Sequence, residues 1–306
     1  MGRRSDGCVA DSVGGTTDRL LRLLRVTVVG RVAAMKPAAG WDTVTDLTAL
    51  AELAPDAMAA FTTLVSSTAS THARAQIAAH PACADYAEQF VADVSVLTDE
   101  QRAALTAALG PGSFDFVQAL WVDDFGGRVT PAWRQLFGIE PVDLADPAPI
   151  ALWPAIEVFL VAVAQLHELD PLTTELIRLR GARAHDCRLC KSLRSVRAVD
   201  GGADEATFDA IDRFEDSDFT ERQKVALRLA DALIWEPAAY PTGLTDQVRA
   251  AFSPAETVEL VLDVMRNAAN KIAVALRADE AHVSEGVEYY DVDDDGQLVY
   301  GLTPAG

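Results

Sequence analysis

Two of the four cysteines in this chain, Cys187 and Cys190, form a CxxC motif, the arrangement in the sequence most able to do redox chemistry. Asp186 precedes the motif and is a typical N-cap residue, so we expect a helix that begins there, with Cys187 in its first turn. The free N–H groups and the helix dipole at that end favour a thiolate. Cys190 follows on the same helix face, within reach of a disulfide.

A redox dithiol is one of three interpretations of this motif. Nearby cations lower the pKa of a thiol, and five of them surround the pair: Arg183, Arg188, Lys191, Arg194 and Arg197. The second interpretation is half of a zinc site, which would need two more ligands. His185 could be one of them, but no second CxxC or His pair lies nearby in the sequence. The third is two incidental buried cysteines. The sequence favours the redox dithiol, with no metal and no cofactor.

The remaining cysteines give no comparable signal. Cys8 falls in the N-terminal stretch, and Cys83 lies in an Ala-rich stretch where a small core residue is expected. Four cysteines in 306 residues do not make a disulfide framework.

The elements that position the motif are expected to be helices, because helical periodicity runs through most of the chain after residue 42. Thr220 with Glu221, and Ser253-Pro254 with Glu256, are typical helix starts. The expected helices cover residues 55–70, 98–109, 114–125, 153–166, 171–184, 187–199, 204–214, 220–235, 244–251 and 253–276.

A β-hairpin is expected at the C-terminal end, where Val287–Tyr290 and Gln297–Tyr300 flank the acidic turn 291–296. The acidic turn also resembles part of a calcium loop. It has Leu302 where the bidentate Glu would stand, so a polar turn is favoured.

Two parts of the chain resemble each other, which indicates an internal duplication. Leu97–Leu105 parallels Phe219–Leu227, and Pro111–Val129 parallels Pro254–Ile272. The first copy lacks the stretch that holds the CxxC; chance similarity between amphipathic helices is the alternative. We expect a disordered extension at 1–34, a degenerate helical repeat at 35–145, the CxxC domain at 146–282 and a C-terminal tail at 283–306.

The net charge of −20 argues against nucleic acid and against anionic membrane surfaces as partners. No apolar run approaches the roughly 20 residues that span a bilayer. The basic, partly apolar stretch 20–35 is a poor targeting signal, since Arg22, Arg25 and Arg31 interrupt it. These features predict a cytoplasmic protein.

The residues around the motif resemble the alkylhydroperoxidase D-like branch of the carboxymuconolactone decarboxylase family. That pattern has a Glu twelve residues before the first Cys, then CxxC, then a His four residues after the second Cys. Glu175, Cys187 and Cys190 match. The resemblance covers about residues 150–280. It implies an all-α helical bundle that assembles as a homo-oligomer, in which Cys190 attacks a peroxide and Cys187 resolves the sulfenic acid.

Arg194 stands where the family has its His, which relays protons together with the Glu. Arg does not deprotonate and cannot take that role. Twelve residues of continuous helix would separate Glu175 from Cys187 by about 18 Å, so the two must lie on different helices of a hairpin bent at His185–Asp186. We therefore expect Glu175 and Arg194 to form an ion pair. His185 is then either a proton carrier or an exposed turn residue.

These features lead to a dithiol peroxidase or thiol–disulfide oxidoreductase that acts on a small peroxide and is restored by a dithiol reductant. A decarboxylase-like enzyme of the wider family is a second hypothesis, although that branch usually lacks the CxxC. The third is a non-enzymatic redox sensor or scaffold, which the missing His favours.

Overall fold

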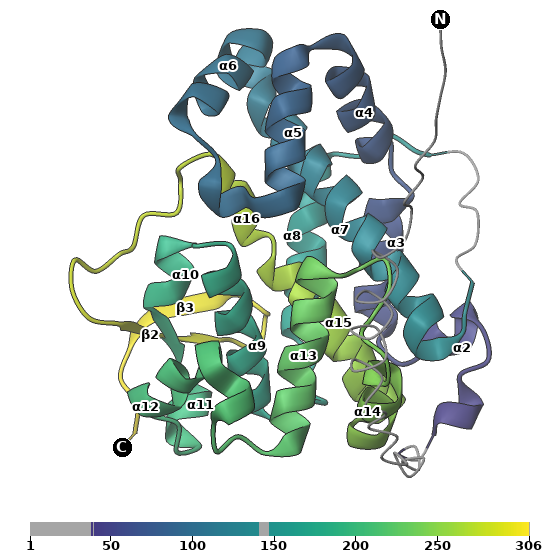
Figure 1. Cartoon of the computed structure of the whole chain (residues 1–306), viewed down its shortest axis with the longest axis vertical. Coiled ribbons are helices and arrows are strands. Elements are labelled where there is room, and N and C mark those ends of the chain that lie inside the picture. The colour runs from purple at the N-terminus through teal and green to yellow at the C-terminus, as the bar shows by residue number, and fades with distance from the viewer. Residues whose placement is uncertain (1–37, 39, 141–146, 306) are drawn as a thin grey trace, which may run out of the picture. The chain divides into compact units, whose positions relative to one another are not determined.

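Helices make up most of the chain that the computed structural model describes, residues 38, 40–140 and 147–305, which confirms the expected all-α character (Figure 1). The predicted extension at 1–34 lies outside these residues. The first half contains α2 (Leu47–Ala51), α3 (Pro55–Val65), α4 (Ala69–Ala79), α5 (Pro81–Asp93), α6 (Asp99–Leu109) and α7 (Ser113–Phe137). The second half contains α8 (Leu152–Ala164), α9 (Pro171–Ala184), α10 (Arg188–Ser192), α11 (Val196–Asp200), α12 (Glu205–Asp209), α13 (Glu221–Trp235), α14 (Leu244–Ala251), α15 (Pro254–Asn267) and α16 (Asn270–Ala275).

Short 3-10 segments connect several of these helices: η1 (Trp41–Thr43), η2 (Val94–Val96), η3 (Gly110–Gly112) and η4 (Ala210–Asp216). The expected helix starts are confirmed. The Thr220 hydroxyl accepts the N–H of Gln223 at the start of α13, and Ser253 accepts the N–H of Glu256 at the start of α15. Each forms a capping box, which satisfies backbone donors that a helix leaves free at its N-terminus.

Helix α7 is much longer than its predicted range of 114–125. It continues through Gly126, Gly127 and Pro131 to Phe137, and most of its residues are buried. These residue types disfavour helix in isolation. Burial of the apolar residues on both sides of them keeps the helix continuous, and Gly138 ends it with a left-handed φ of 72°.

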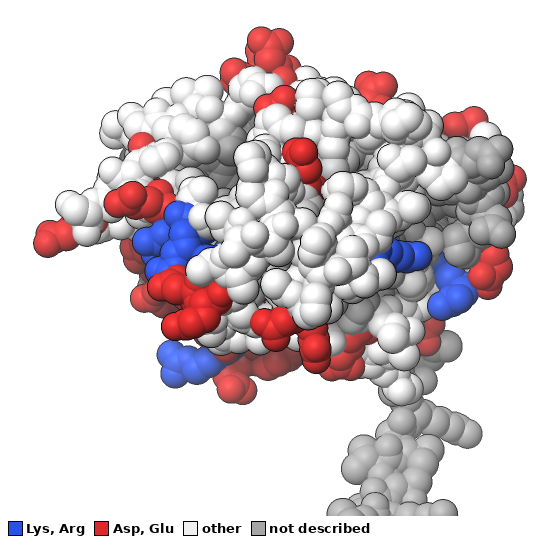
Figure 2. All heavy atoms as spheres, turned by 90° about the horizontal axis from the view of Figure 1, so that it is seen from above, with Lys and Arg blue, Asp and Glu red and all other residues white. Residues whose placement is uncertain are grey.

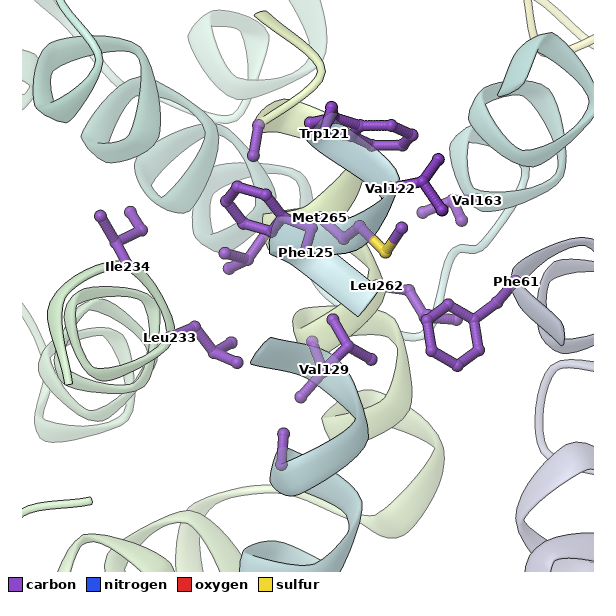
Figure 3. Close-up of a cluster of buried hydrophobic side chains, with 14 of the residues drawn as sticks. Phe61, Trp121, Val122, Phe125, Val129, Val163, Leu233, Ile234, Leu262 and Met265 are labelled. Carbon is purple, nitrogen blue, oxygen red and sulfur yellow. The ribbon is translucent and has the colours of Figure 1, made fainter. Parts of the chain in front are cut away.

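The core lies around α7, and Figure 3 shows its centre. Side chains from α3, α7, α8, α13 and α15 meet there: Phe61, Trp121, Phe125, Val163, Leu233, Leu262 and Met265. One buried cluster extends from Trp41 to Ala275 and includes the fully buried Cys83, as expected for a small core residue. Both proposed repeats contribute to this cluster; their origin by duplication stays a prediction.

A small sheet stands beside α9 and is formed by β1 (Leu193–Ser195), β2 (Glu288–Val292) and β3 (Leu298–Leu302) in the order β1-β2-β3. The β2–β3 pair is the expected hairpin, and its Tyr290 pairs with Tyr300. Strand β1 runs parallel to β2, with Arg194 opposite Tyr289. The predicted helix 187–199 is therefore wrong: it is divided into α10, β1 and α11.

Acidic side chains outnumber basic ones on the face of the protein that Figure 2 shows. This agrees with the net charge of −20. In the described residues no helix has both the length and the apolar composition needed to cross a membrane.

Candidate functional site: a disulfide beside a cleft

The two cysteines of the CxxC motif are joined as a disulfide, with their Cα atoms 5.3 Å apart. Cys187 is buried, at 1% exposure, whereas Cys190 is partly exposed. The expected cap is wrong, because Cys187 and not Asp186 is the N-cap of α10, and its Sγ accepts the N–H of Cys190 at 3.2 Å. Asp186 has a φ of 53° and makes the sharp turn out of α9.

Cys190 lines a cleft of about 650 Å³, and Cys187 does not. Helix α8 contributes one wall, the end of α15 and the start of α16 contribute a second, and the β2–β3 hairpin contributes a third. The lining residues are Glu157, Leu160, Val161, Arg178, Leu189, Cys190, Leu193, Arg266, Asn267, Ala269, Asn270, Ala273, Tyr290, Gly296, Gln297, Leu298 and Tyr300. Of the two cysteines, only Cys190 therefore borders the cleft.

Glu175 of α9 does not line this cleft but contacts Arg178 and Tyr290, which do; it is 1% exposed and accepts four hydrogen bonds. Arg178 donates two of them, at 2.6 and 2.7 Å, the N–H of Ser195 donates one at 3.1 Å, and the Tyr290 hydroxyl donates one at 2.9 Å. All four groups donate to the carboxylate, which is the arrangement expected for a carboxylate that accepts hydrogen bonds and donates none. The carboxylate thus joins α9 to β1 and to the hairpin.

Arg178 connects this carboxylate to the disulfide. Its Nη1 donates to the carbonyl of Cys190 at 2.8 Å, and its Nη2 donates to the carbonyl of Leu193 at 2.9 Å. Burial alone would lower the pKa of this guanidinium, but Glu175 opposite it holds that pKa above its ordinary value. Burial also raises the pKa of the Tyr290 hydroxyl, whose ring lies under Arg178. The three side chains form one buried network that fixes the backbone at Cys190, Leu193 and Ser195.

The expected Glu175–Arg194 ion pair is absent. Arg194 instead forms a two-point ion pair with Glu205 of α12, both contacts at 2.9 Å, and stacks over Phe208. Position 194 lies in β1 rather than on a helix that continues from the CxxC. Its side chain therefore points to Glu205 and does not line the cleft, whereas the neighbouring Leu193 does. Arg178, one turn after Glu175 on the same helix, forms the ion pair with Glu175 that was expected of Arg194.

His185 is neither an exposed turn residue nor a group that lines the cleft. It is buried at 4% exposure, and its Nδ1 lies 2.8 Å from Oδ1 of Asn270. Burial and the nearby Lys271 lower its pKa to about 3, so the ring is neutral at physiological pH. An imidazole with this pKa is a poor proton carrier near neutrality.

The basic cluster around the motif is present, but each of its cations has a carboxylate partner. Arg183 pairs with Asp212, Arg188 with Asp279, Lys191 with Asp186, Arg194 with Glu205 and Arg197 with Asp291. The cluster therefore supplies far less positive potential to the thiols than its composition indicates.

Sequence reasoning missed Arg178, Arg266 and Tyr290, the last because it is 115 residues away from the carboxylate it contacts. It also missed two buried carboxylates of α15 beside a smaller cavity of about 80 Å³. Burial and the neighbouring Asp263 raise the pKa of Glu259 to about 8, and burial raises that of Asp263 to about 7. The described residues contain no group of three or more His, Cys, Asp or Glu side chains placed to hold a metal ion.

The fold and the site together define a mostly helical protein with a dithiol–disulfide pair beside a cleft large enough for an organic molecule. The chain is 44% identical over 227 residues to the uncharacterized protein Rv2313c of Mycobacterium tuberculosis strain H37Rv, an alignment that covers 71% of this chain and 80% of the relative. The uncharacterized protein MT2376 of M. tuberculosis strain CDC 1551 matches to the same extent. The chain belongs to the family of these mycobacterial proteins. No protein-family model and no solved structure matches it.

Proposed function

We propose that this protein is a dithiol peroxidase, a thiol–disulfide oxidoreductase that reduces peroxides with Cys190 and Cys187. The observation that carries the proposal is the disulfide at the cleft, in which Cys190 lines the cleft and its partner Cys187 is buried. The resemblance of Glu175 and the CxxC to the alkylhydroperoxidase D-like pattern supports the same chemistry.

In the proposed reaction, the Cys190 thiolate attacks one peroxide oxygen. A sulfur–oxygen bond forms as the oxygen–oxygen bond breaks, and the departing alkoxide takes a proton and leaves as an alcohol. The Cys187 thiolate then attacks the sulfur of the Cys190 sulfenic acid; the S–O bond breaks, the departing hydroxide takes a proton from solvent and leaves as water, and the disulfide forms. An external dithiol returns two electrons by thiol–disulfide exchange and becomes a disulfide itself.

The surroundings give each cysteine a separate task. The N–H of Cys190 that faces Cys187 Sγ favours a thiolate on the resolving cysteine. The Glu175–Arg178–Tyr290 network acts by positioning, since Arg178 holds the carbonyl of Cys190 and so fixes the attacking residue against the cleft. The protein is expected to act on a small peroxide, without metal or cofactor, as a cytoplasmic homo-oligomer.

A non-enzymatic redox sensor is the second candidate, and one observation favours it. No imidazole lines the cleft in the described part of the chain, because His185 is turned into the core and Arg194 faces Glu205. A dithiol without a proton carrier oxidises once and is re-reduced slowly.

Peroxide consumption with dithiothreitol as reductant distinguishes these functions. We expect turnover by the wild-type protein, none by Cys190→Ser, and a single equivalent by Cys187→Ser that leaves a dimedone-reactive sulfenic acid on Cys190. Oxidation of wild type by one equivalent without turnover would indicate the sensor. Undiminished turnover by Cys190→Ser would contradict both functions.

A further inference from the structure

The cleft beside Cys190 is far larger than a small inorganic peroxide requires. Its volume of about 650 Å³ corresponds to roughly 20 water molecules at about 30 Å³ each. Sites that bind organic small molecules span about 300–1,000 Å³. The size alone therefore indicates an organic molecule as the occupant.

The wall of the cleft next to Cys190 is apolar. Leu189 and Leu193 flank the cysteine, Leu160 and Val161 of α8 lie on one side, and Leu298 of β3 lies on another. Leu298 is 43% exposed, so the hairpin presents an apolar side chain to a solvent-filled space. Removing such a surface from water favours a ligand with a hydrocarbon body.

Two cations also line the cleft, and they differ in how many of their donors are used. Arg178 uses four of its five N–H groups, two on Glu175 and two on the carbonyls of Cys190 and Leu193. Arg266, at the end of α15, uses only its Nε, which donates to the carbonyl of Leu160 at 3.1 Å. Among the described residues neither Nη of Arg266 makes a hydrogen bond, so both are available to a ligand.

The one carboxylate paired with Arg266 is a weak competitor for these donors. Asp263 Oδ1 stands 4.0 Å from Nη1, beyond hydrogen-bond distance. Burial raises the pKa of Asp263 to about 7, which leaves a large share of it uncharged at neutral pH. Arg266, which lines both this cleft and the smaller cavity beside Asp263, therefore has no carboxylate at hydrogen-bond distance among the described residues.

A second donor next to Arg266 also lacks a partner. The side-chain nitrogen of Asn267 is closed off from solvent and makes no hydrogen bond to any described residue, and Asn267 is one of the residues that line the same cleft. Buried polar groups without partners are rare in native proteins because each costs free energy. Two unused donors on consecutive residues form a site for an anionic group with several acceptor atoms.

We propose that the cleft binds a carboxylate-bearing organic hydroperoxide, with its carboxylate on Arg266 and Asn267, its hydrocarbon body along Leu160 and Leu298, and its peroxide group at Cys190. This substrate class rests on the proposed peroxidase function, and it deepens that function. The chemistry at Cys190 is unchanged: the carboxylate takes no part in electron transfer and serves to hold the peroxide at the sulfur.

Binding can be measured without any peroxide, which separates this inference from the peroxidase function. The probes are octanoate and 1-octanol, which share an eight-carbon chain and differ in the carboxylate. The readout is the rate at which iodoacetamide alkylates Cys190 in the Cys187→Ser protein, followed by mass spectrometry of the Cys190 peptide. We expect octanoate to half-protect Cys190 at a concentration about tenfold lower than octanol, as one charge-assisted contact predicts.

The variants Arg266→Gln and Asn267→Leu, each made in Cys187→Ser, test the two donors. Arg266→Gln should bring the half-protecting concentrations of octanoate and octanol together, and Asn267→Leu should narrow their ratio. Arg266→Lys keeps the charge and should restore part of the preference, which a variant that has merely unfolded would not do. Arg74→Gln, which removes a cation that is 73% exposed and pairs with Asp123, is the matched control and should keep the full preference.

Equal protection by octanoate and octanol, or an unchanged preference in Arg266→Gln, would overturn the proposal. If octanoate protects through Arg266 but no peroxide is turned over, the anion site stands and the peroxidase function fails. If peroxides are turned over without preference for the acid, the function stands and the anion site fails.

Discussion

Replacing Glu175 by Gln is the most direct test of the buried network beside the cleft. The substitution keeps the size of the side chain and removes its charge. Arg178, whose side chain is 10% exposed, is then left as a buried cation without its counter-ion. The new amide nitrogen would also face an Arg178 donor, since both carboxylate oxygens accept from that guanidinium. Removing one partner of a buried ion pair costs about 3–5 kcal/mol of the free energy of unfolding.

The cost can be measured as urea or thermal unfolding followed by far-UV circular dichroism, with all proteins kept in the same redox state. At about 2–4 °C per kcal/mol for domains of this size class, Glu175→Gln should lower the unfolding midpoint by roughly 6–20 °C. Tyr290→Phe removes one of the four hydrogen bonds and should cost about 1–2 kcal/mol. Because both residues belong to one network, the double variant should cost less than the sum.

The matched control is Asp212→Asn, which removes a carboxylate that is 59% exposed and pairs with Arg183 at 2.9 Å. An exposed pair of this kind contributes about 0–1 kcal/mol. The reasoning is refuted if Glu175→Gln destabilises the protein no more than Asp212→Asn. That result would mean that Glu175 does not carry the charge that compensates Arg178.

Three further predictions follow from the same structure. Arg194→His should give no gain in peroxide turnover, measured with dithiothreitol as reductant, because position 194 faces Glu205 and not the cleft; a large gain would show that the side chain reaches Cys190. Gly296→Ala should loosen the hairpin, since its φ of 76° disfavours other residues and a Cβ would lie 2.9 Å from Val161; limited proteolysis should then cut the C-terminal segment faster, and an unchanged rate would count against this docking. Burial raises the pKa of Glu259 to about 8, so this carboxyl stays protonated in the folded protein while the unfolded chain loses its proton near pH 4.5. The contribution of Glu259 to the free energy of unfolding is therefore complete below pH 4.5 and is lost as the pH rises towards 8. Wild type should accordingly lose stability over this range by up to about 1.4 kcal/mol per pH unit more than Glu259→Gln, and parallel stability curves would contradict the raised pKa.

Local signals in the sequence predicted the scaffold well. Capping residues and Pro at first helical positions determine where α9, α13 and α15 begin, because these interactions lie within four residues along the chain. The single helix predicted at 253–276 is in fact divided into α15, which ends at Asn267, and α16, which begins at Asn270. The hairpin β2–β3 has an equally local cause, its alternating strands and its acidic turn. The helix predicted at 187–199 was wrong because Arg178 and Glu175 take the backbone groups of Leu193 and Ser195, and β2 pairs with the strand that results.

The CxxC and the Glu twelve residues before it were visible in the sequence, and with them the disulfide and the family resemblance. The sequence did not show which cation Glu175 would meet, because Arg178 and Arg194 are equally basic and only the break after α10 turns Arg194 towards Glu205. Likewise, the sequence does not reveal the pKa of a histidine beside a redox motif. Burial against Asn270 and Lys271 is what makes His185 neutral.

The sequence by itself determined the reactive pair, its three-residue spacing and the starts of most helices, since all of these depend on neighbours in the chain. Tertiary structure alone decided that Cys190 and not Cys187 lines the cleft. It also decided that Tyr290 completes the network on Glu175 and that Arg266 and Asn267, two residues that line the cleft, have donors without a partner among the described residues. Those properties depend on desolvation and on contacts across about a hundred residues, which no local pattern in the chain encodes.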